Sequence, residues 1–145
     1  MADGKGLIDA GAMPQLVAVG IGCRKQFARA DIVALVRSTL ADRVPPLRAK
    51  RLFTLIDKRG DGELAAAAAL LDLELVFLSR EALAAVAPRC LTDSRAAQRR
   101  FGLPSIAEAA ALAGAGAGAR LLGPRRIGAG VTCALALAAA EGAPR

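Results

Sequence analysis

The chain has 145 residues, 54% of them hydrophobic, which is enough to bury the core of one ordinary domain. Its formal net charge of +7 attracts polyanions, but it has only four phenylalanines and neither tryptophan nor tyrosine on which nucleic-acid bases would stack, so we expect no nucleic-acid partner. It has no histidine, and its three cysteines show no CxxC spacing, which excludes histidine-activated nucleophiles and argues against zinc. We therefore expect no metal and no cofactor.

The N-terminal residues contain glycine and aspartate where a secretory signal carries a continuous apolar segment. We therefore predict a flexible segment over 1–14, no export signal and a cytoplasmic protein. A single domain is expected over 15–140, followed by a frayed tail at 141–145. The longest apolar run, 131–140 apart from Thr132, is far shorter than the roughly 18 to 20 residues of a membrane-spanning helix, so no membrane partner is expected.

The first half of the chain alternates between strand and helix signals. Residues 16–21, LVAVGI, predict a short strand, and the apolar residues between 32 and 40 recur at helical spacing. LFTLI at 52–56 predicts a second strand, the alanine-rich stretch 64–71 a second helix, and ELVFL at 74–78 a third strand. Alternation of this kind predicts a mostly parallel sheet with helices on both faces.

Three helices are predicted next, over 80–87, 94–101 and 106–113, separated by proline and glycine residues. The last of them begins with the spacing of a capping box. In that motif the Ser105 hydroxyl and the Glu108 carboxylate each accept a hydrogen bond from a free backbone amide at the helix start. Capping is also the structural alternative to a functional role for Glu108.

The C-terminal part of the chain predicts a hairpin at the end of the sheet. The AGAGAGA segment at 113–119 is interpreted as a connector whose glycines cap the preceding helix. Segments 119–123 and 131–138 predict two strands, and the loop between them carries RRIG at 125–128. The predicted fold is a three-layer α/β domain: a mostly parallel sheet of about five strands, helices on both faces and a C-terminal hairpin.

The loop GIGCRK at 20–25 follows the first predicted strand, where a dinucleotide-binding turn would lie, but Lys25 stands in place of that motif's third glycine. Its two glycines still let the backbone approach a ligand, and Arg24 adds positive charge before a helix. The loop is thus either an anion site or a tight turn with solvated cations. Cys23 is either a thiolate activated by these cations or a small packed residue.

The loop DKRGDGEL at 57–64 has aspartates in the places of a calcium loop, but Arg59 stands at the third ligand position and Ala68 where a bidentate glutamate is needed. We interpret it as a βα loop that carries Lys58 and Arg59, with Asp61 near the next helix start. Ligands of open α/β sheets bind at the carboxyl ends of parallel strands, where the first two basic loops are expected. The side reached by the RRIG loop depends on strand direction, which the sequence leaves open.

Four blocks in order resemble the C-terminal domain of the cobalt-precorrin-5A hydrolase family, CbiG, which includes a stand-alone relative in aerobic cobalamin biosynthesis. The blocks are GIGCRK at 20–25, TLIDKRGDGEL at 54–64, GLPSIAEAAAL at 102–112 and LLGPRRIGAGVTCALA at 121–136. The resemblance extends over residues 16–138.

This resemblance implies a set of ligand-binding residues. Those that match the family's motifs are Gly20, Gly22, Cys23, Arg24, Lys25, Lys58, Ser105, Glu108 and Thr132. The chain departs from the family at residues 26–28, which lack a Gly-Thr-Ser type segment. It also departs at Asp61, where the family has a longer acidic side chain, and at Arg125, where the family usually has a lysine.

The resemblance also implies a role in building the corrin ring of cobalamin, with a precorrin or corrinoid intermediate and other cobalamin-pathway enzymes as partners. The full-length hydrolase opens a ring lactone, and the match lies outside its N-terminal part, so we expect the domain to bind, deliver or present an intermediate. Two alternatives stay open. One is an enzyme that acts on the same intermediate through Cys23, Lys58 or Glu108. The other is a nucleotide- or phosphate-binding α/β domain, suggested by the strand, glycine and helix order at 16–32.

The charge pattern independently agrees with a corrin-precursor ligand. Such a ligand is a large apolar macrocycle ringed with acetate and propionate carboxylates, so it needs cations around an apolar floor. The basic loops supply Arg24, Lys25, Lys58, Arg59, Arg125 and Arg126. The absence of histidine favours binding over catalysis.

Overall fold

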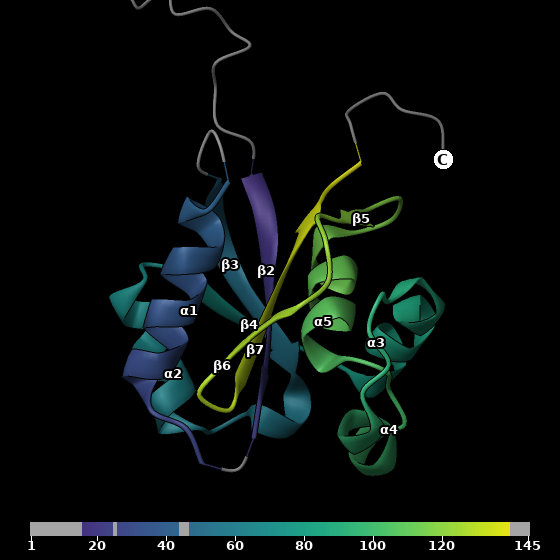
Figure 1. Cartoon of the computed structure of the whole chain (residues 1–145), viewed down its shortest axis with the longest axis horizontal. Helices are drawn as coiled ribbons and strands as arrows, with labels where there is room; N and C mark the ends of the chain where they lie inside the picture. The colour runs from purple at the N-terminus through teal and green to yellow at the C-terminus, as the bar shows by residue number, and fades with distance from the viewer. Residues whose placement is uncertain (1–15, 25, 44–46, 140–145) are drawn as a thin grey trace, which may run out of the picture.

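A computed structural model shows how the chain folds (Figure 1). It describes residues 16–24, 26–43 and 47–139. Lys25 of the first basic loop, the predicted N-terminal segment 1–14 and the predicted tail 141–145 lie outside these residues. The boundaries of the single domain expected over 15–140 stay a prediction.

The first half of the chain contains the predicted alternation of strands and helices. In order it forms β2 (Leu16–Cys23), α1 (Arg29–Ala41), β3 (Arg48–Leu55), the 3₁₀ helix η2 (Ile56–Lys58), α2 (Gly62–Leu70) and β4 (Glu74–Leu78). The branched side chains of β2 suit a pleated strand, and the alanines of α2 have high helix propensity. Asp61, which was predicted near the start of this helix, is its N-cap, because its Oδ1 accepts a hydrogen bond of 3.1 Å from the amide of Leu64.

The second half contains the three predicted helices and differs from prediction near its end. It forms α3 (Arg80–Val86), the 3₁₀ helix η3 (Ala87–Arg89), α4 (Arg95–Phe101), α5 (Ile106–Ala115), β5 (Arg120–Leu121), β6 (Arg126–Gly128) and β7 (Val131–Leu137). The first part of the AGAGAGA segment belongs to α5 instead of the connector. Gly114 fits there because a Cβ at this position would lie 2.5 Å from the ring of Phe53. The short strand β6 was not predicted.

The strands form one sheet in the order β4-β3-β2-β7-β5, with β6 also paired to β7. β4, β3 and β2 are parallel, whereas β7 runs antiparallel to β2, β5 and β6. The α/β fold with a mostly parallel core and C-terminal antiparallel strands is confirmed, and the sheet has six strands within the described residues. The first residue of β7, Val131, pairs with Cys23 at the end of β2. The β6–β7 turn therefore lies at the carboxyl edge of the parallel strands.

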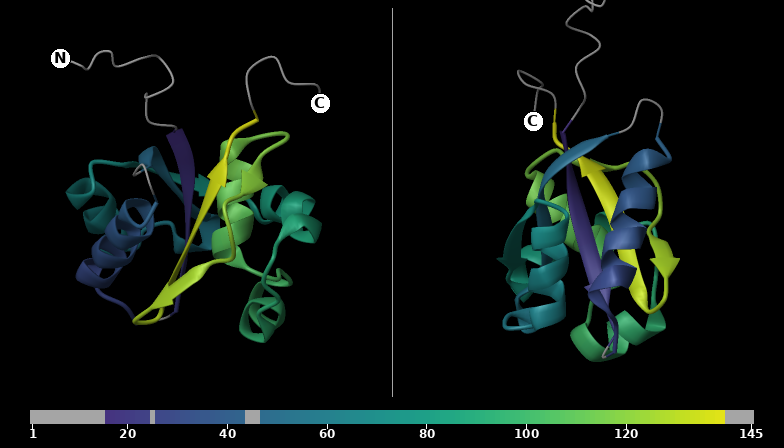
Figure 2. Two further views of the ribbon diagram at one scale, coloured as in Figure 1. Left: turned by 45° about the horizontal axis from the view of Figure 1, so that its top comes forward. Right: turned by 90° about the vertical axis from the view of Figure 1, so that its left-hand side faces the viewer.

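Helices cover both faces of the sheet (Figures 1 and 2). α1 and α2 lie together on one face, as right-handed crossovers place them when successive parallel strands are added on one side. α5 lies on the other face against β2, and α3 packs on α5. A Cβ at Gly20 of β2 would lie 2.0 Å from the carbonyl oxygen of Ala107 in α5. Gly20 is therefore required for α5 to pack directly on the sheet.

The core is aliphatic on both faces of the sheet. Val19, Ile32 and Leu64 are fully buried between the sheet and the helices α1 and α2. On the other face small side chains such as Ala107 and Ala134 allow α5 to approach the strands closely. Within the described ranges, no helix is both long enough and apolar enough to cross a membrane.

Candidate functional site

The end of β2 and the β6–β7 turn are joined at the carboxyl edge of the sheet. The amide of Arg24, just after β2, donates a hydrogen bond of 3.0 Å to the carbonyl oxygen of Gly130 in the turn. Ala129 and Gly130 have φ values of 51° and 80°, which a tight hairpin turn requires. The sequence did not show at which edge of the sheet the RRIG loop at 125–128 lies. The structure places it at the same edge as the loops after β2 and β3. This edge is where open α/β sheets bind ligands.

A cavity of about 130 Å³ opens here between the β6–β7 hairpin, α4 and the start of α5. The predicted ligand-binding residues that line it are Gly22, Cys23, Arg24, Arg125 and Thr132. None of the described residues in its lining is an aspartate or glutamate. Arginines therefore give this cavity a positive charge, and we take it as the candidate site.

α4 supplies a wall of the cavity that the sequence reasoning missed. Ala97, Arg100 and Phe101 line the cavity from α4, and Ile127 lines it from β6. The guanidinium carbon of Arg100 lies 4.9 Å from the centroid of the Phe101 ring. This distance is that of a cation–π contact, which keeps the Arg100 guanidinium beside the ring. The helical spacing of these residues is visible in the sequence, but nothing in the sequence shows that this helix face meets the end of β2.

Other predicted site residues lie around the cavity without lining it. The Lys58 ammonium nitrogen lies 5.7 Å from the centroid of the Phe27 ring, and it is close enough to Cys23 to influence the pKa of that thiol. Arg59 is exposed in the turn that follows η2. Gly20 lies beneath α5. The structure thus brings Lys58 near the cavity and places Arg59 and Gly20 outside its lining.

The carboxylate of Glu108 is fully buried and joins two loops to α5. Its Oε1 accepts hydrogen bonds from the amides of Leu91 and Thr92, at 2.7 and 2.8 Å. Its Oε2 accepts hydrogen bonds from the Thr92 hydroxyl at 2.6 Å and from the Arg125 amide at 2.8 Å. Since these donors occupy both oxygens, the geometry makes Glu108 a positioning residue for the loop of Arg125 and for the loop before α4.

The predicted capping box at the start of α5 is correct in one half and wrong in the other. Ser105 is fully buried, and its hydroxyl accepts a hydrogen bond of 3.2 Å from the amide of Glu108. The reciprocal bond from the Ser105 amide to the Glu108 carboxylate is not formed between these two described residues. The carboxylate instead turns toward donors on the loops at Leu91 and Arg125.

Gly22 and Thr132 fit each other on the neighbouring strands β2 and β7. A Cβ at Gly22 would lie 2.6 Å from Oγ1 of Thr132 and 3.3 Å from the Cβ of Ile106. The Thr132 hydroxyl donates a hydrogen bond of 3.2 Å to the carbonyl oxygen of Gly22. Both residues line the cavity, so this contact shapes its floor.

The thiol of Cys23 is protonated at neutral pH. Burial raises its pKa to about 12, and the nearby Lys58 ammonium offsets only part of that rise. Burial likewise raises the pKa of Cys90 to about 11 and that of Cys133 to about 12. A nucleophilic cysteine needs a lowered pKa. The surroundings of Cys23 therefore favour the packed residue over the activated thiolate.

A larger cavity of about 300 Å³ lies between the end of α1 and the connection from β5 to β6. Its cations already have partners, because Arg126 pairs with Asp42 and Arg43 donates a hydrogen bond to the carbonyl oxygen of Leu122. The arginines of the smaller cavity form no ion pair with another described residue. For that reason we place the candidate site in the smaller cavity.

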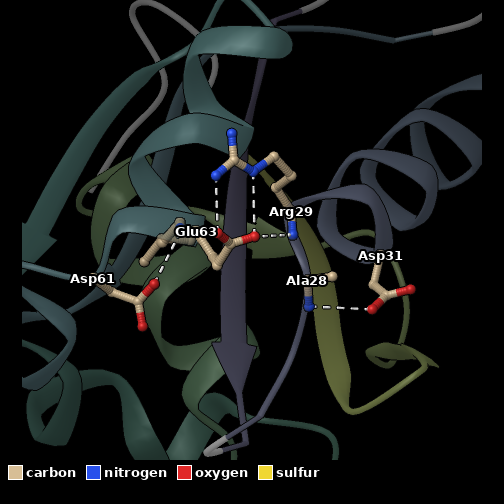
Figure 3. Close-up of polar contacts among 6 residues, drawn as sticks. Ala28, Arg29, Asp31, Asp61 and Glu63 are labelled. Carbon is tan, nitrogen blue, oxygen red and sulfur yellow. Dashed lines mark hydrogen bonds and ion pairs between the residues drawn. The ribbon is translucent and has the colours of Figure 1, made fainter.

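An ion pair joins α1 to α2 beside this edge of the sheet (Figure 3). Nη2 of Arg29 lies 2.9 Å from Oε2 of Glu63, and the amide and Nε of Arg29 donate to Oε1 at 2.9 and 3.2 Å. These hydrogen bonds favour the charged carboxylate and lower the pKa of Glu63 to about 2. The contact fixes the start of α1 against the start of α2.

The fold and the site together define an α/β protein of the open-sheet class, with a small arginine-lined cavity at the carboxyl edge of its parallel strands. In the part of the chain that the structure describes, no three cysteine, aspartate or glutamate side chains are grouped to hold a metal ion. Anion binding is the chemistry that this arrangement suits best.

The chain belongs to the family described as Cobalamin synthesis G C-terminus, whose model matches residues 17–136. Its role therefore lies in cobalamin biosynthesis, as the resemblance of the four sequence blocks implied. A comparison with curated protein sequences gives no match.

Two solved structures are similar to the chain in both sequence and fold. CobE, a protein from the cobalamin (vitamin B12) biosynthetic pathway, is 36% identical with a TM-score of 0.76, over 86% of this chain and 92% of that one. The cobalamin biosynthesis protein chiG from Agrobacterium tumefaciens is 37% identical with a TM-score of 0.68, over 86% and 99%. A putative cobalamin biosynthesis protein G homolog from Sulfolobus solfataricus is 19% identical with a TM-score of 0.64, over 86% and 37%, and shows the fold alone.

Proposed function

We propose that the protein binds an intermediate of corrin-ring synthesis and holds it for delivery or presentation to another enzyme of the cobalamin pathway. The observation that carries this proposal is the cavity at the carboxyl edge, whose described lining residues include arginines and no carboxylate. A corrin precursor combines an apolar ring with peripheral acetate and propionate groups. Guanidinium groups pair strongly with such carboxylates when both are partly desolvated.

The two predicted arginines of the cavity come from loops that are held in place. Arg24 is tied to the β6–β7 turn through its amide and the carbonyl oxygen of Gly130. Arg125 is tied to α5 through its amide and the Glu108 carboxylate. Cations on fixed loops lose less conformational entropy when they bind a ligand than cations on free loops do. This supports a binding site in preference to a solvated basic surface.

Three observations support binding over catalysis at this site. The chain has no histidine to serve as a general base. The pKa of Cys23 is raised to about 12, which suppresses its thiolate at neutral pH. Both oxygens of Glu108 accept hydrogen bonds from the protein, so that carboxylate is not available to a substrate proton.

The nucleotide-binding alternative loses support because packing uses the two glycines that suggested it. Gly20 lies directly under the Ala107 carbonyl of α5, and Gly22 lies against Thr132. In a dinucleotide-binding turn such glycines let the backbone approach a pyrophosphate. Here their missing side chains make room for the protein itself.

The proposal is tested by titrating the purified protein with late precorrin intermediates and following the visible absorption of the tetrapyrrole. We expect a saturable spectral change and release of a ligand of unchanged mass. The absence of any spectral change at tens of micromolar protein contradicts the proposal. Release of a ligand with altered mass replaces it with the enzyme alternative.

Variants locate the binding site on the protein. Arg24→Ala and Lys58→Ala should each weaken binding by about 1 kcal/mol or more, and added salt should weaken it further. Arg48→Ala is the matched control, because Arg48 is exposed at the opposite end of β3. Unchanged affinity in both test variants moves the site elsewhere on the molecule.

A further inference from the structure

The candidate cavity is too small to enclose the ligand that we propose. Its volume is about 130 Å³, whereas pockets that enclose small-molecule ligands measure roughly 300–1,000 Å³. A tetrapyrrole must therefore lie across the mouth of the cavity with only part of its edge inserted, or the walls must move apart. In both cases the residues at the mouth contact the ring.

Ile127 is a large apolar side chain at this mouth. It lines the cavity from β6, yet 64% of it is exposed. Covering this exposed side chain with an apolar surface is favourable, because it removes apolar area from water. A phosphate or a single carboxylate offers no such surface, whereas the face of a macrocycle does. Charge and hydrophobicity at the mouth thus fit one ligand that has both an apolar face and peripheral carboxylates.

α4 forms the facing wall and is weakly anchored to the rest of the protein. None of its residues is buried, in contrast to α1, α2, α3 and α5. It is held near its ends, where the Ser94 amide donates to the Pro104 carbonyl oxygen at 2.7 Å and the Arg80 guanidinium carbon lies 5.6 Å from the centroid of the Phe101 ring. Because Phe101 is only partly buried against the core and no residue of α4 is fully buried, this helix shifts at less cost in packing energy than the other helices.

The two sides of α4 differ in what they face. Arg100 lines the cavity together with Ala97 and Phe101, whereas Arg95 and Arg99, one helical turn apart, lie outside its lining. The cation–π contact keeps the Arg100 guanidinium near the ring of Phe101, which also lines the cavity. Arg100 is therefore placed to pair with a ligand carboxylate, and Arg99 is not.

We infer that α4 and β6 are the two walls of a groove that binds a polycarboxylate tetrapyrrole. The face of the ring covers Ile127, Arg100 pairs with one peripheral carboxylate, and α4 adjusts its position as the ring enters. Arg100 and Ile127 then make the site specific for a ring that carries carboxylates. This inference rests on the proposed function, because it assigns that site its ligand class and two specificity-determining residues.

The inference is tested with uroporphyrin, a tetrapyrrole with acetate and propionate side chains, by fluorescence titration of the 145-residue chain. We expect Arg100→Ala and Ile127→Ala each to weaken binding about fivefold or more, since one removes a charge-assisted pair and the other an apolar contact. The controls Arg99→Ala and Leu70→Ala should stay within about twofold of the unmodified protein. Leu70 is 57% exposed on α2, outside the cavity lining.

Two further measurements test separately whether the macrocycle is needed for binding and whether α4 contacts the ligand. Butanetetracarboxylate, which carries carboxylates but no ring, should fail to displace uroporphyrin at equal concentration. Hydrogen exchange of the α4 amides should slow when uroporphyrin is added, while exchange in α1 stays unchanged. Thermal melting of each variant checks that it is folded.

The possible failures can be told apart. If the unmodified protein binds neither uroporphyrin nor a precorrin, the proposed function fails together with this inference. If it binds uroporphyrin and Arg24→Ala weakens that binding, but Arg100→Ala and Ile127→Ala do not, the groove between α4 and β6 is refuted and the proposed function stands. Equal competition by butanetetracarboxylate refutes the role of the ring face.

Discussion

The amide of Arg125 donates a hydrogen bond of 2.8 Å to Oε2 of Glu108, whose carboxylate is fully buried. The same carboxylate accepts hydrogen bonds from Leu91 and Thr92, in the loop that leads to α4. One acidic side chain thus ties together the loop that carries a cavity cation and the loop that leads to a cavity wall. It does so without lining the cavity itself.

Replacement of this carboxylate tests how much the site depends on it. Glu108→Gln puts an amide donor where the protein presents only donors, and it removes the charge that strengthens their hydrogen bonds. We expect the free energy of unfolding to fall by about 3 kcal/mol, as measured by urea denaturation, and ligand affinity to fall as well. Glu81→Gln on the exposed side of α3 is the control and should change stability by less than about 0.5 kcal/mol. A Glu108→Gln protein as stable as the parent contradicts the anchoring role.

The contact between β2 and α5 predicts a severe effect of one methyl group. A Cβ in Gly20→Ala would lie 2.0 Å from the Ala107 carbonyl oxygen and 2.5 Å from the Ala111 amide nitrogen. Because both are backbone atoms of a packed helix, we expect a loss of about 3 kcal/mol or more, or failure to fold. Gly62→Ala has no atom within 4 Å of the added Cβ and serves as the control. Thermal melting compares the two, and a normal melting temperature for Gly20→Ala refutes this packing.

The raised thiol pKa values predict slow cysteine chemistry in the folded protein. Burial holds the pKa of Cys23 and Cys133 at about 12 and that of Cys90 at about 11. We expect alkylation by iodoacetamide at pH 8 to be much slower than in urea, where the thiols regain a pKa near 8.5. Peptide mass mapping assigns each site. Rapid, selective modification of Cys23 in the folded protein restores the activated-thiolate interpretation.

The same pKa shifts predict how stability changes in alkali. A pKa that folding raises stabilises the protein below the unfolded pKa, and this contribution is lost as pH rises toward the folded value. For these thiols the loss runs from about pH 9 to about pH 12. We expect the urea midpoint to fall over this range, and to fall less in Cys133→Ala. Identical pH profiles for the parent and Cys133→Ala contradict the shift at that residue.

The ion pair between α1 and α2 predicts the opposite pH dependence. Arg29 lowers the pKa of Glu63 to about 2, so the ionised carboxylate stabilises the protein above its unfolded pKa of about 4.3. This stabilisation is lost as pH falls from that value through about 2. Glu63→Gln should therefore lower the melting temperature slightly at pH 7, since the pair is partly exposed, and by much less near pH 2, where about half of the carboxylate is protonated. A difference that is as large at pH 2 as at pH 7 has another cause.

Local patterns in the sequence were sufficient for most of the elements. The strand at 74–78 and the helix starts at Ser79, Ser94 and Ser105 depend on side chains within a few residues of one another. β6 was not predicted, because its three residues form a strand only through pairing with β7. Prediction of the connector at 113–119 failed at Gly114, which lies within α5, where its missing side chain leaves room for the ring of Phe53.

The candidate site was predictable only in part. The glycines and cations next to the end of β2 were visible as a motif, and the resemblance to the family pointed to Arg125 and Thr132. The α4 wall was not visible, because Arg100 and Ile127 approach the end of β2 only after α4 and the hairpin are placed. Contacts between such distant segments leave no local pattern.

The sequence by itself determined the α/β class, the basic edge of the sheet and the family. The class and the basic edge follow from apolar periodicity, strand order along the chain and charge near strand ends, all of which are local properties. The family follows from the resemblance of the four sequence blocks. Only the tertiary structure decided the direction of β7, the α4 wall and the role of Glu108. Leu91 and Arg125 lie 17 residues on either side of Glu108, so the donors that reach its carboxylate are set by the folding of two distant loops.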